Sequence, residues 1–152
     1  MTNSEHMFNK ETEYALRGLV YIQMQNNNSS RPGIDEIASA IQAPRFYIAK
    51  ILQRLVRQGF LVSLKGKGGG FFFDNTRPDL SIKDVITSIQ GDSIITGCGF
   101  GLSHCSNDNP CPLHDKYAPI REAIDKLVST ETIQSLAARN IYLTLPTADK
   151  KI

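Results

Sequence analysis

The spacing of apolar residues predicts three helices at the start of the chain. Apolar positions recur at helical spacing over residues 9–25, and the polar segment 25–33 ends that pattern with Asn, Ser, Pro and Gly. A short amphipathic helix follows, with two acids in its first turn, where the helix dipole favours them. Its inward positions are Ile34, Ile37, Ala38 and Ile41. A third helix is predicted with Pro44 at its first position, because a missing N–H has no cost there. Its inward stripe is Ile48, Ile51, Leu52, Leu55 and Val56.

A β-hairpin is predicted directly after the third helix. Gly59 is expected to end that helix as a left-handed cap. Residues 60–64 and 71–73 have the pattern of two strands, and the glycine-rich segment 65–70 has that of the turn between them. Three helices followed by a hairpin is the element order of a winged helix-turn-helix. The predicted fold class is therefore mainly α with a small β-hairpin.

The second half of the chain predicts further helices around an aperiodic segment. Ser81 begins a helix that runs to about residue 89, with a capping-box-like start. Residues 91–112 have no hydrophobic period and contain all three cysteines. A helix resumes near Asp115, and one more short helix is predicted between residues 130 and 141. The apolar stripe of the longer helix is Ile120, Ala123, Ile124, Leu127 and Val128. The last ten or so residues are expected to be loose.

Length and composition set the broad class. The chain has 152 residues, of which 41% are apolar and 21% charged, so a folded domain is expected and a wholly disordered chain is excluded. No segment approaches the roughly 18 uninterrupted apolar residues of a membrane span. The first ten residues have no apolar signal region. We therefore expect a cytoplasmic protein with no membrane partner.

The charges are distributed unevenly. Residues 1–78 contain ten Lys/Arg and six Asp/Glu, whereas residues 79–152 contain seven Lys/Arg and nine Asp/Glu. No acidic residue lies between Glu36 and Asp74. That interval carries Arg45, Lys50, Arg54, Arg57, Lys65 and Lys67. A local positive field of this kind suits a polyanion.

The basic helix and hairpin are arranged as a DNA-binding surface would be. The second helix of a helix-turn-helix enters the major groove, where residues near its start contact base edges and other cations contact phosphates. At the leading end, the candidates are Pro44, Arg45, Phe46 and Tyr47, followed by Lys50 and Arg54. In the hairpin turn they are Lys65, Lys67 and Gly68. A basic face is also compatible with a solvated surface or a protein-interaction module.

Five segments carry a resemblance to a known family. They are Tyr14-Ala-Leu-Arg17, Ile34-Asp-Glu-Ile-Ala38, Ile51-Leu-Gln-Arg-Leu55, Gly59-Phe-Leu-Val62 and the wing Gly66-Lys-Gly-Gly-Gly-Phe71. From about Glu13 to about Ile141 the chain resembles the winged-helix transcription regulators of the Rrf-two family (IscR, NsrR and CymR type). The resemblance implies a homodimer joined by the helix at about 115–129. It also implies control of promoters with palindromic double-stranded DNA operators. The chain then divides into a DNA-binding region, 1–78, and a region of cluster-binding loop and dimerisation helices, 79–152.

The cysteines suggest a soft-metal centre. Cys98, Cys105 and Cys111 lie in one Gly-rich segment, and thiolates are ligands of iron–sulfur clusters and of zinc. Cluster-binding members of the family that the chain resembles carry three cysteines here, usually with five residues in each gap. This chain has six residues in the first gap and five in the second. The resemblance implies an iron–sulfur cluster, with two-iron and four-iron forms both open.

The fourth ligand has three candidates. His114 is the first, because the Cys111-Pro-Leu-His114 spacing matches the Cys-x-x-His end found in some family members. Glu13 is the second, because it aligns with an acid that ligates across the dimer in other members. His104, adjacent to Cys105, is the third. Without a metal, the three cysteines would be free or disulfide-forming thiols.

The sequence therefore predicts a transcriptional regulator, with repression the favoured role, that senses redox state, nitric oxide or iron–sulfur status. We expect the bound cluster to order residues 98–114 and so shift how two DNA-binding regions are placed. A ligand shifts such an equilibrium only by its differential affinity for the two arrangements, typically about 1–3 kcal/mol. One alternative is a cluster-free repressor of the same fold that uses redox thiols or a protein partner. A small iron–sulfur electron carrier is the other, and no catalytic constellation indicates an enzyme.

Overall fold

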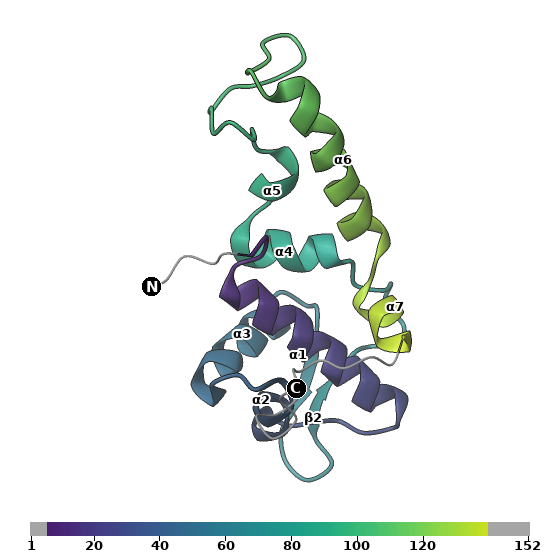
Figure 1. The fold of residues 1–152 in the computed structure, drawn as a ribbon. Coiled ribbons are helices and arrows are strands. Elements are labelled where there is room, and N and C mark those ends of the chain that lie inside the picture. Colours follow the sequence, from purple (N-terminus) through teal and green to yellow (C-terminus); the bar gives the residue numbers. More distant parts are fainter. Residues whose placement is uncertain (1–5, 140–152) are drawn as a thin grey trace, which may run out of the picture.

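The computed structural model describes residues 6–139 and has the predicted mainly helical architecture with one small hairpin (Figure 1). The elements are α1 (Lys10–Asn27), α2 (Ile34–Ile41), α3 (Arg45–Arg57), β1 (Val62–Leu64), β2 (Gly70–Phe72), α4 (Ile82–Gln90), α5 (Ser93–Thr96), α6 (His114–Thr130) and α7 (Ile133–Ala138). The fold class is confirmed. Residues 1–5 and 140–152 lie outside the described part of the chain, and the prediction of loose C-terminal residues falls on that second range.

Helices α1, α2 and α3 share one apolar core. Gly18 of α1 allows this close packing, since a Cβ built there would lie 3.3 Å from Ile48 Cδ1. The predicted inward positions are buried as a group; among the most buried side chains are Leu19, Ile37, Ile41, Ile48, Leu52 and Leu55. The hydrophobic stripe of α3 thus fixes its orientation and leaves its opposite face outward.

The two ends of α3 differ in how well they were predicted. Pro44 precedes the helix as its N-cap, in an extended conformation with ψ of 129°, so its prediction as the first helical residue is wrong. Its carbonyl accepts the N–H groups of Tyr47 and Ile48. At the other end, Gly59 has φ of +82°, and its N–H and that of Phe60 bond back to the last turn of α3. The predicted glycine cap is confirmed.

The hairpin is a short antiparallel pair. Val62 faces Phe72 and Leu64 faces Gly70, so the first strand is shorter than the predicted 60–64, and the second has the predicted length but begins one residue before 71–73. The turn depends on glycine: a Cβ at Gly69 would lie 2.2 Å from the Leu64 carbonyl oxygen. A Cβ at Gly70 would meet the Arg31 carbonyl oxygen at the same distance. Glycine at these two positions therefore lets the turn pack closely on the end of β1 and lets the start of β2 pack closely on the segment before α2.

Helices α4 and α7 pack back onto α1. Ser81 caps α4 by accepting the N–H of Asp84, as its position predicted. Ile82 donates to the Glu131 carbonyl and Ile133 donates to the Leu80 carbonyl, which joins the chain before α4 to the chain before α7. Leu80, Val85, Ile133 and Ala137 belong to the same core as α1–α3. The later helices therefore support the helix-turn-helix as well as carrying the cysteine segment.

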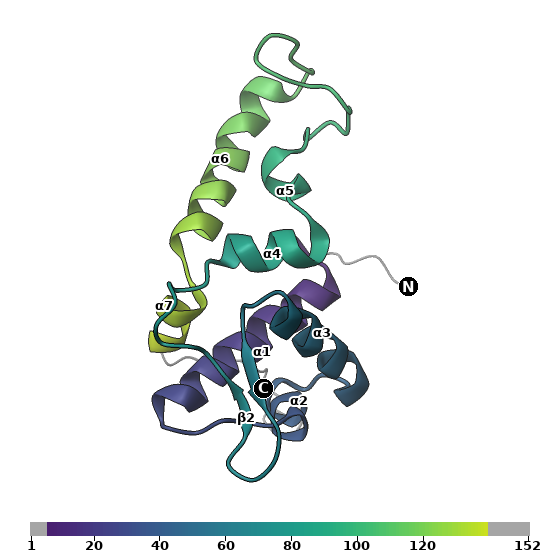
Figure 2. The same cartoon turned by 180° about the vertical axis from the view of Figure 1, so that it is seen from behind.

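The cysteine segment and the wing lie at opposite ends of the molecule (Figures 1 and 2). Helix α6 packs on α4 and α5 and leads to the far end, while α4 lies between α1 and α5. The one-turn helix α5 lies inside 91–112, a segment predicted to be irregular throughout. Its four residues are too few to give a readable period, and Ile94 and Ile95 pack beside Ile82, Ile86 and Val128. In the described part of the chain, none of the helices has the length and apolar character required to cross a bilayer.

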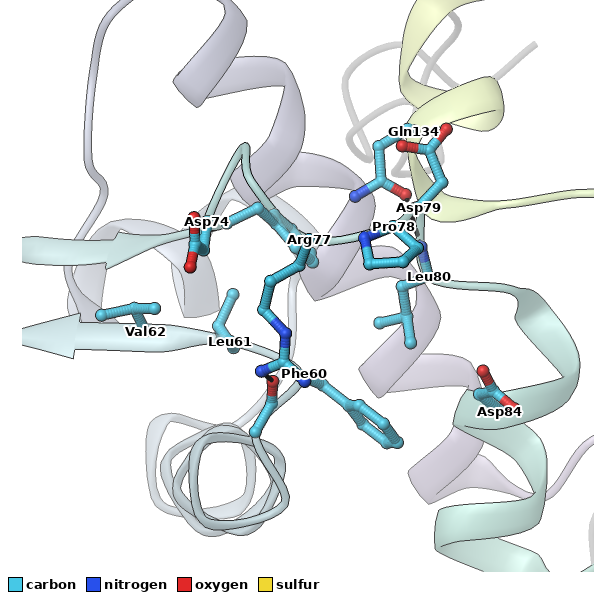
Figure 3. Close-up of a pocket in the computed structure, with 12 residues that line it drawn as sticks. Phe60, Leu61, Val62, Asp74, Arg77, Pro78, Asp79, Leu80, Asp84 and Gln134 are labelled. Atoms are coloured by element: carbon cyan, nitrogen blue, oxygen red, sulfur yellow. Dashed lines mark hydrogen bonds between the residues drawn. The ribbon is translucent and has the colours of Figure 1, made fainter.

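A small cavity of about 210 Å³ lies behind the wing (Figure 3). The Arg77 side chain enters it, with Asp74 and Pro78 beside it, and its guanidinium donates to the Gly59 carbonyl. This bond ties the end of α3 to the chain after the wing. Because ligand pockets are commonly about 300–1,000 Å³, we assign this cavity a structural role.

The buried stripe of α3 gives a stability prediction. Leu52 is 0% exposed, so Leu52→Ala is expected to lower the free energy of unfolding by about 2–5 kcal/mol. Leu64→Ala removes the same atoms from a side chain that is 49% exposed and should cost roughly 1 kcal/mol or less. Urea denaturation of both variants measures the difference. Equal losses would contradict the core described here.

Candidate cysteine centre and DNA-facing surface

The sulfurs of the three cysteines lie close together in the loop that precedes α6. The Sγ atoms of Cys98, Cys105 and Cys111 all lie within 4.8 Å of one another. Cys98 Sγ and Cys111 Sγ are 3.4 Å apart, and the N–H of Cys111 donates to Cys105 Sγ at 3.3 Å. Cys111 is 8% exposed, whereas Cys98 and Cys105 are half-buried. The loop therefore gathers three soft donors in a partly enclosed site.

The environment makes the thiols unequal. Burial raises the pKa of Cys98, but N–H donation from Leu102 and Phe100 and contacts with the thiols of Cys111 and Cys105 outweigh it and lower the pKa from 9.0 to about 7. At Cys105, the N–H of Cys111 favours the thiolate, but burial and the two neighbouring thiols raise the pKa above its ordinary value. Of these two thiols, Cys98 is thus the one that ionises first.

His114 adjoins the sulfur group at one corner. Its Nδ1 lies 3.4 Å from Cys105 Sγ, and its Nε2 lies 2.8 Å from Asn107 Oδ1. As the first residue of α6 it is only 7% exposed, which is unusual for a histidine in a polar loop region. A hydrogen bond at the second ring nitrogen orients the imidazole, as partners commonly do for ligating histidines.

The other two candidates for the fourth ligand make no contact with the sulfurs among the described residues of one chain. His104 is exposed in the loop. Glu13 is on α1, where its carboxylate pairs with His6 and with Lys10. Of the three candidates, the structure therefore brings His114 alone into contact with a cysteine sulfur, within residues 6–139.

Two residues of α6 that the sequence analysis missed shape the loop. Arg121 donates to the Gly97 carbonyl at 2.8 Å, immediately before Cys98. The Tyr117 ring covers Gly99 so closely that a Cβ there would lie 2.5 Å from the ring. The signal that could have revealed them is the alternation of glycines at 97, 99 and 101, which indicates close approach of another group.

The leading end of α3 is an exposed surface. Pro44, Arg45, Phe46, Tyr47 and Lys50 are all exposed, and the Phe46 ring is 72% exposed. Lys50 Nζ lies 4.9 Å from the centre of that ring. The Arg45 side chain pairs with Asp35 of α2. The Phe46 ring therefore projects from this end of α3 with the Lys50 ammonium group beside it.

Arg54 is oriented differently from the other predicted contacts. Its guanidinium donates to Glu11 Oε1 at 3.2 Å and to the Ser88 carbonyl at 2.7 Å. The Ser88 hydroxyl in turn donates to Gln58. These bonds join α3 to α1 and α4, so this side chain is already engaged within the fold.

The wing presents the remaining predicted residues. Lys65, Lys67 and Gly68 are exposed, and across the described residues neither ammonium group has an ion-pair partner. Gly68 has φ of +79°, in the region that favours glycine. A hollow of about 560 Å³ separates the wing from α3, with Gln53, Arg57 and Lys65 among its lining residues.

Helix α6 has an apolar face without a covering element within residues 6–139. Val128 is 1% exposed and packs on α4, whereas Ile120 is 55% exposed and Leu127 is 50% exposed. Ala123 is also exposed. The predicted stripe is thus split between an inward side and an outward side.

Comparison with known proteins identifies the class. A family model named Rrf2 and described as an iron-dependent transcriptional regulator matches residues 8–139. The chain belongs to this family of DNA-binding, winged-helix transcriptional regulators, and the predictions of family and of a non-enzymatic role are confirmed.

Among particular relatives, an HTH-type transcriptional regulator of Aquifex aeolicus is 29% identical over 133 residues, which are 86% of this chain and 90% of that protein. The transcriptional regulator NsrR of Oceanobacillus iheyensis is 24% identical, over 84% of this chain and 86% of that protein. Of solved structures, CymR, the global cysteine regulator of B. subtilis, has a TM-score of 0.71 at 18% identity, covering 88% of this chain and 98% of that one. T. potens IscR has a TM-score of 0.67 at 13% identity and covers 90% of each chain. These structural likenesses support the fold.

The unequal thiols predict a pH dependence in the metal-free, reduced protein. Because the thiolate is the nucleophile, alkylation of Cys98 by iodoacetamide should rise as pH passes about 7, where its pKa lies. Cys105 should require a pH above its ordinary 9.0, because its pKa is raised. Peptide mass spectrometry at each pH measures the two rates, with the urea-unfolded chain as the control. Parallel pH profiles for the two cysteines in the folded protein would contradict the assignment.

Proposed function

We propose that this chain is a homodimeric transcriptional regulator, acting as a repressor, in which an iron–sulfur cluster held by Cys98, Cys105 and Cys111 controls binding to a palindromic operator. The observation that carries the proposal is the convergence of three sulfurs within 4.8 Å. Its physiological signal is redox state, nitric oxide or iron–sulfur supply, acting on the occupancy of this centre.

The donor set fits the proposed cofactor. Three thiols and one imidazole are soft and borderline ligands that suit iron–sulfur centres. Cys98 would bind with little cost of deprotonation, because its pKa is about 7. His114 is the proposed fourth ligand, since its Nδ1 already lies 3.4 Å from Cys105 Sγ. The alternatives Glu13 and His104 make no such contact within one described chain. When bound, the cluster would supply a site that oxidants and nitric oxide attack.

The residues around the centre offer a route to the DNA-binding surface. Arg121 of α6 holds the Gly97 carbonyl next to the first cysteine, and α5 leads from there to α4. At that same end of α4, in its last turn, the Ser88 carbonyl accepts the guanidinium of Arg54 of α3. The next link is Gln90, which accepts both the Asn9 N–H and the Thr12 hydroxyl of α1. We propose that binding of a cluster closes the loop and moves α4. Because α3 is bonded to α4, α3 would move with it in each subunit of the dimer.

The dimer is proposed on the outward face of α6. Its exposed residues Ile120, Ala123 and Leu127 form an apolar strip that a second copy of the same helix would cover. Two winged-helix units related by a two-fold axis would then meet successive major grooves about 34 Å apart. Because that spacing is geometrically strict, a small rotation of each unit would change affinity.

The DNA contacts are proposed for the exposed residues of α3 and the wing. Pro44, Arg45, Phe46, Tyr47 and Lys50 would face the major groove, with Phe46 suited to a thymine methyl and Arg45 to guanine. Lys65, Lys67 and Gly68 would approach the phosphate backbone. Arg54 would act by holding α3 against α1 and α4, since two of its guanidinium nitrogens already donate there.

The cofactor proposal is tested on anaerobically purified protein. We expect iron and acid-labile sulfide in the wild type together with visible absorption, and their loss in Cys105→Ala because one of three sulfur ligands is removed. His114→Ala should keep colour with a changed spectrum or faster loss of iron. His104→Ala is the matched control and should match the wild type, because His104 is exposed in the loop.

Two results would change this account. An unchanged spectrum in His114→Ala with a changed one in Glu13→Ala would move the fourth ligand to α1. Wild-type protein without iron or sulfide that still binds DNA would replace the cluster sensor by a cluster-free repressor.

The wing contact predicts an effect on salt dependence. Lys67→Ala should weaken binding to all DNA sequences similarly and lower the slope of log K against log salt by about one unit, because one phosphate contact is lost. Fluorescence anisotropy over a salt series measures this slope. Lys126→Ala removes the same charge from an exposed position of α6 and is the control. If Lys67→Ala leaves the slope unchanged, the wing does not contact phosphate.

A further inference from the structure

The thiols of Cys98 and Cys111 are close enough to react with each other. Cys98 Sγ and Cys111 Sγ are 3.4 Å apart, and both residues are free cysteines. A disulfide requires about 2.05 Å between the sulfurs, so the pair must close by roughly 1.4 Å. We propose that the metal-free chain forms an intramolecular Cys98–Cys111 disulfide when it meets a peroxide. This modification does not depend on the proposed cluster function.

Two features favour this pairing over one with Cys105. The Cys105 sulfur accepts the N–H of Cys111 at 3.3 Å and contacts His114 Nδ1 at 3.4 Å. Those contacts hold the Cys105 sulfur against the buried His114 at the start of α6. The Cys98 sulfur instead accepts the N–H of Phe100 at 3.3 Å, a contact within its own loop segment. Arg121 and Tyr117 hold the backbone at Gly97 and Gly99, so the short motion needed for closure would come from rotation of the Cys98 side chain.

Exposure sets the order of the two chemical steps. Cys98 is half-buried and accessible to a small oxidant, whereas Cys111 is 8% exposed. Hydrogen peroxide would oxidise the Cys98 thiol to a sulfenic acid and release one water. The Cys111 sulfur would then attack the Cys98 sulfur, forming the S–S bond and expelling the hydroxyl, which leaves as a second water with the Cys111 proton. The two thiols lose two electrons and two protons, and the peroxide is reduced to water.

The consequence is a reversible block of the soft-ligand site. The disulfide would remove two of the three sulfur donors and leave Cys105 with its His114 contact. A thiol reductant would restore the free pair by exchange. This consequence, unlike the disulfide itself, rests on the proposed function: the oxidised chain could not accept iron and sulfide until it was reduced.

The test uses the full-length, reduced, metal-free protein treated anaerobically with one equivalent of hydrogen peroxide. Free thiols should fall from the three present in the chain to one, with an intact mass lower by two hydrogens and no covalent dimer. Peptide mapping should identify Cys98 linked to Cys111. Cys105→Ser should still form this disulfide, whereas Cys98→Ser and Cys111→Ser should not, and dithiothreitol should reverse it.

A disulfide that contains Cys105, one that joins two chains, or a sulfinic acid at Cys98 without any bond would overturn the inference. Reconstitution with iron and sulfide separates it from the proposed function. If the reduced apoprotein loads and the disulfide form loads equally well, the block is wrong. If the reduced apoprotein never loads while the disulfide forms as expected, the cluster proposal fails and the modification site stands.

Discussion

The close approach of three cysteine sulfurs constrains the rest of this molecule. Cys98, Cys105 and Cys111 can meet within 4.8 Å only if the chain turns back onto the start of α6. The turn is held by contacts that belong to α6: Arg121 on the Gly97 carbonyl and the Tyr117 ring over Gly99. The helix that carries the proposed dimer face is thus also the wall of the soft-ligand site. Any change in the loop acts directly on that helix.

The DNA-binding end depends on a second set of contacts, which connect to the first through α4. Arg54 joins α3 to both α1 and α4, and Gln90 joins the end of α4 to the start of α1. Spatial continuity of this kind is compatible with coupling, and the coupling itself is a free energy that must be measured. The arrangement nevertheless explains why a centre at one end of the molecule and a wing at the other (Figure 2) belong to one regulatory unit in our proposal.

Periodicity predicted the parts of the fold in which an apolar stripe decides the structure. The inward positions of α2 and α3 and the glycine cap at Gly59 follow from local patterns, and so do the helix and hairpin order. Pro44 was misplaced by one position, because a proline φ of about −60° is shared by the helix and by its N-cap, and ψ alone separates them. Helix α5 was missed because a single turn has no measurable period. Arg54 was predicted as a DNA contact from its charge, and that prediction stays open, but sequence alone could not show that two of its donors bond to Glu11 and to the Ser88 carbonyl. The cysteine spacing predicted the clustering of the three sulfurs, but the roles of Tyr117 and Arg121 required the tertiary contact between α6 and the loop.

The central claim is that the state of the cysteine centre sets the affinity for DNA. It is tested most directly by the Kd for one duplex, selected by the protein itself from random sequences, at fixed salt and under anaerobic, reducing conditions. The same preparation is measured before and after iron is removed with a chelator. We expect the two Kd values to differ by about 5–150-fold, the range of a typical coupling free energy. Equal affinity of the two forms would contradict the account, because the sulfur site would then have no influence on the DNA-binding surface.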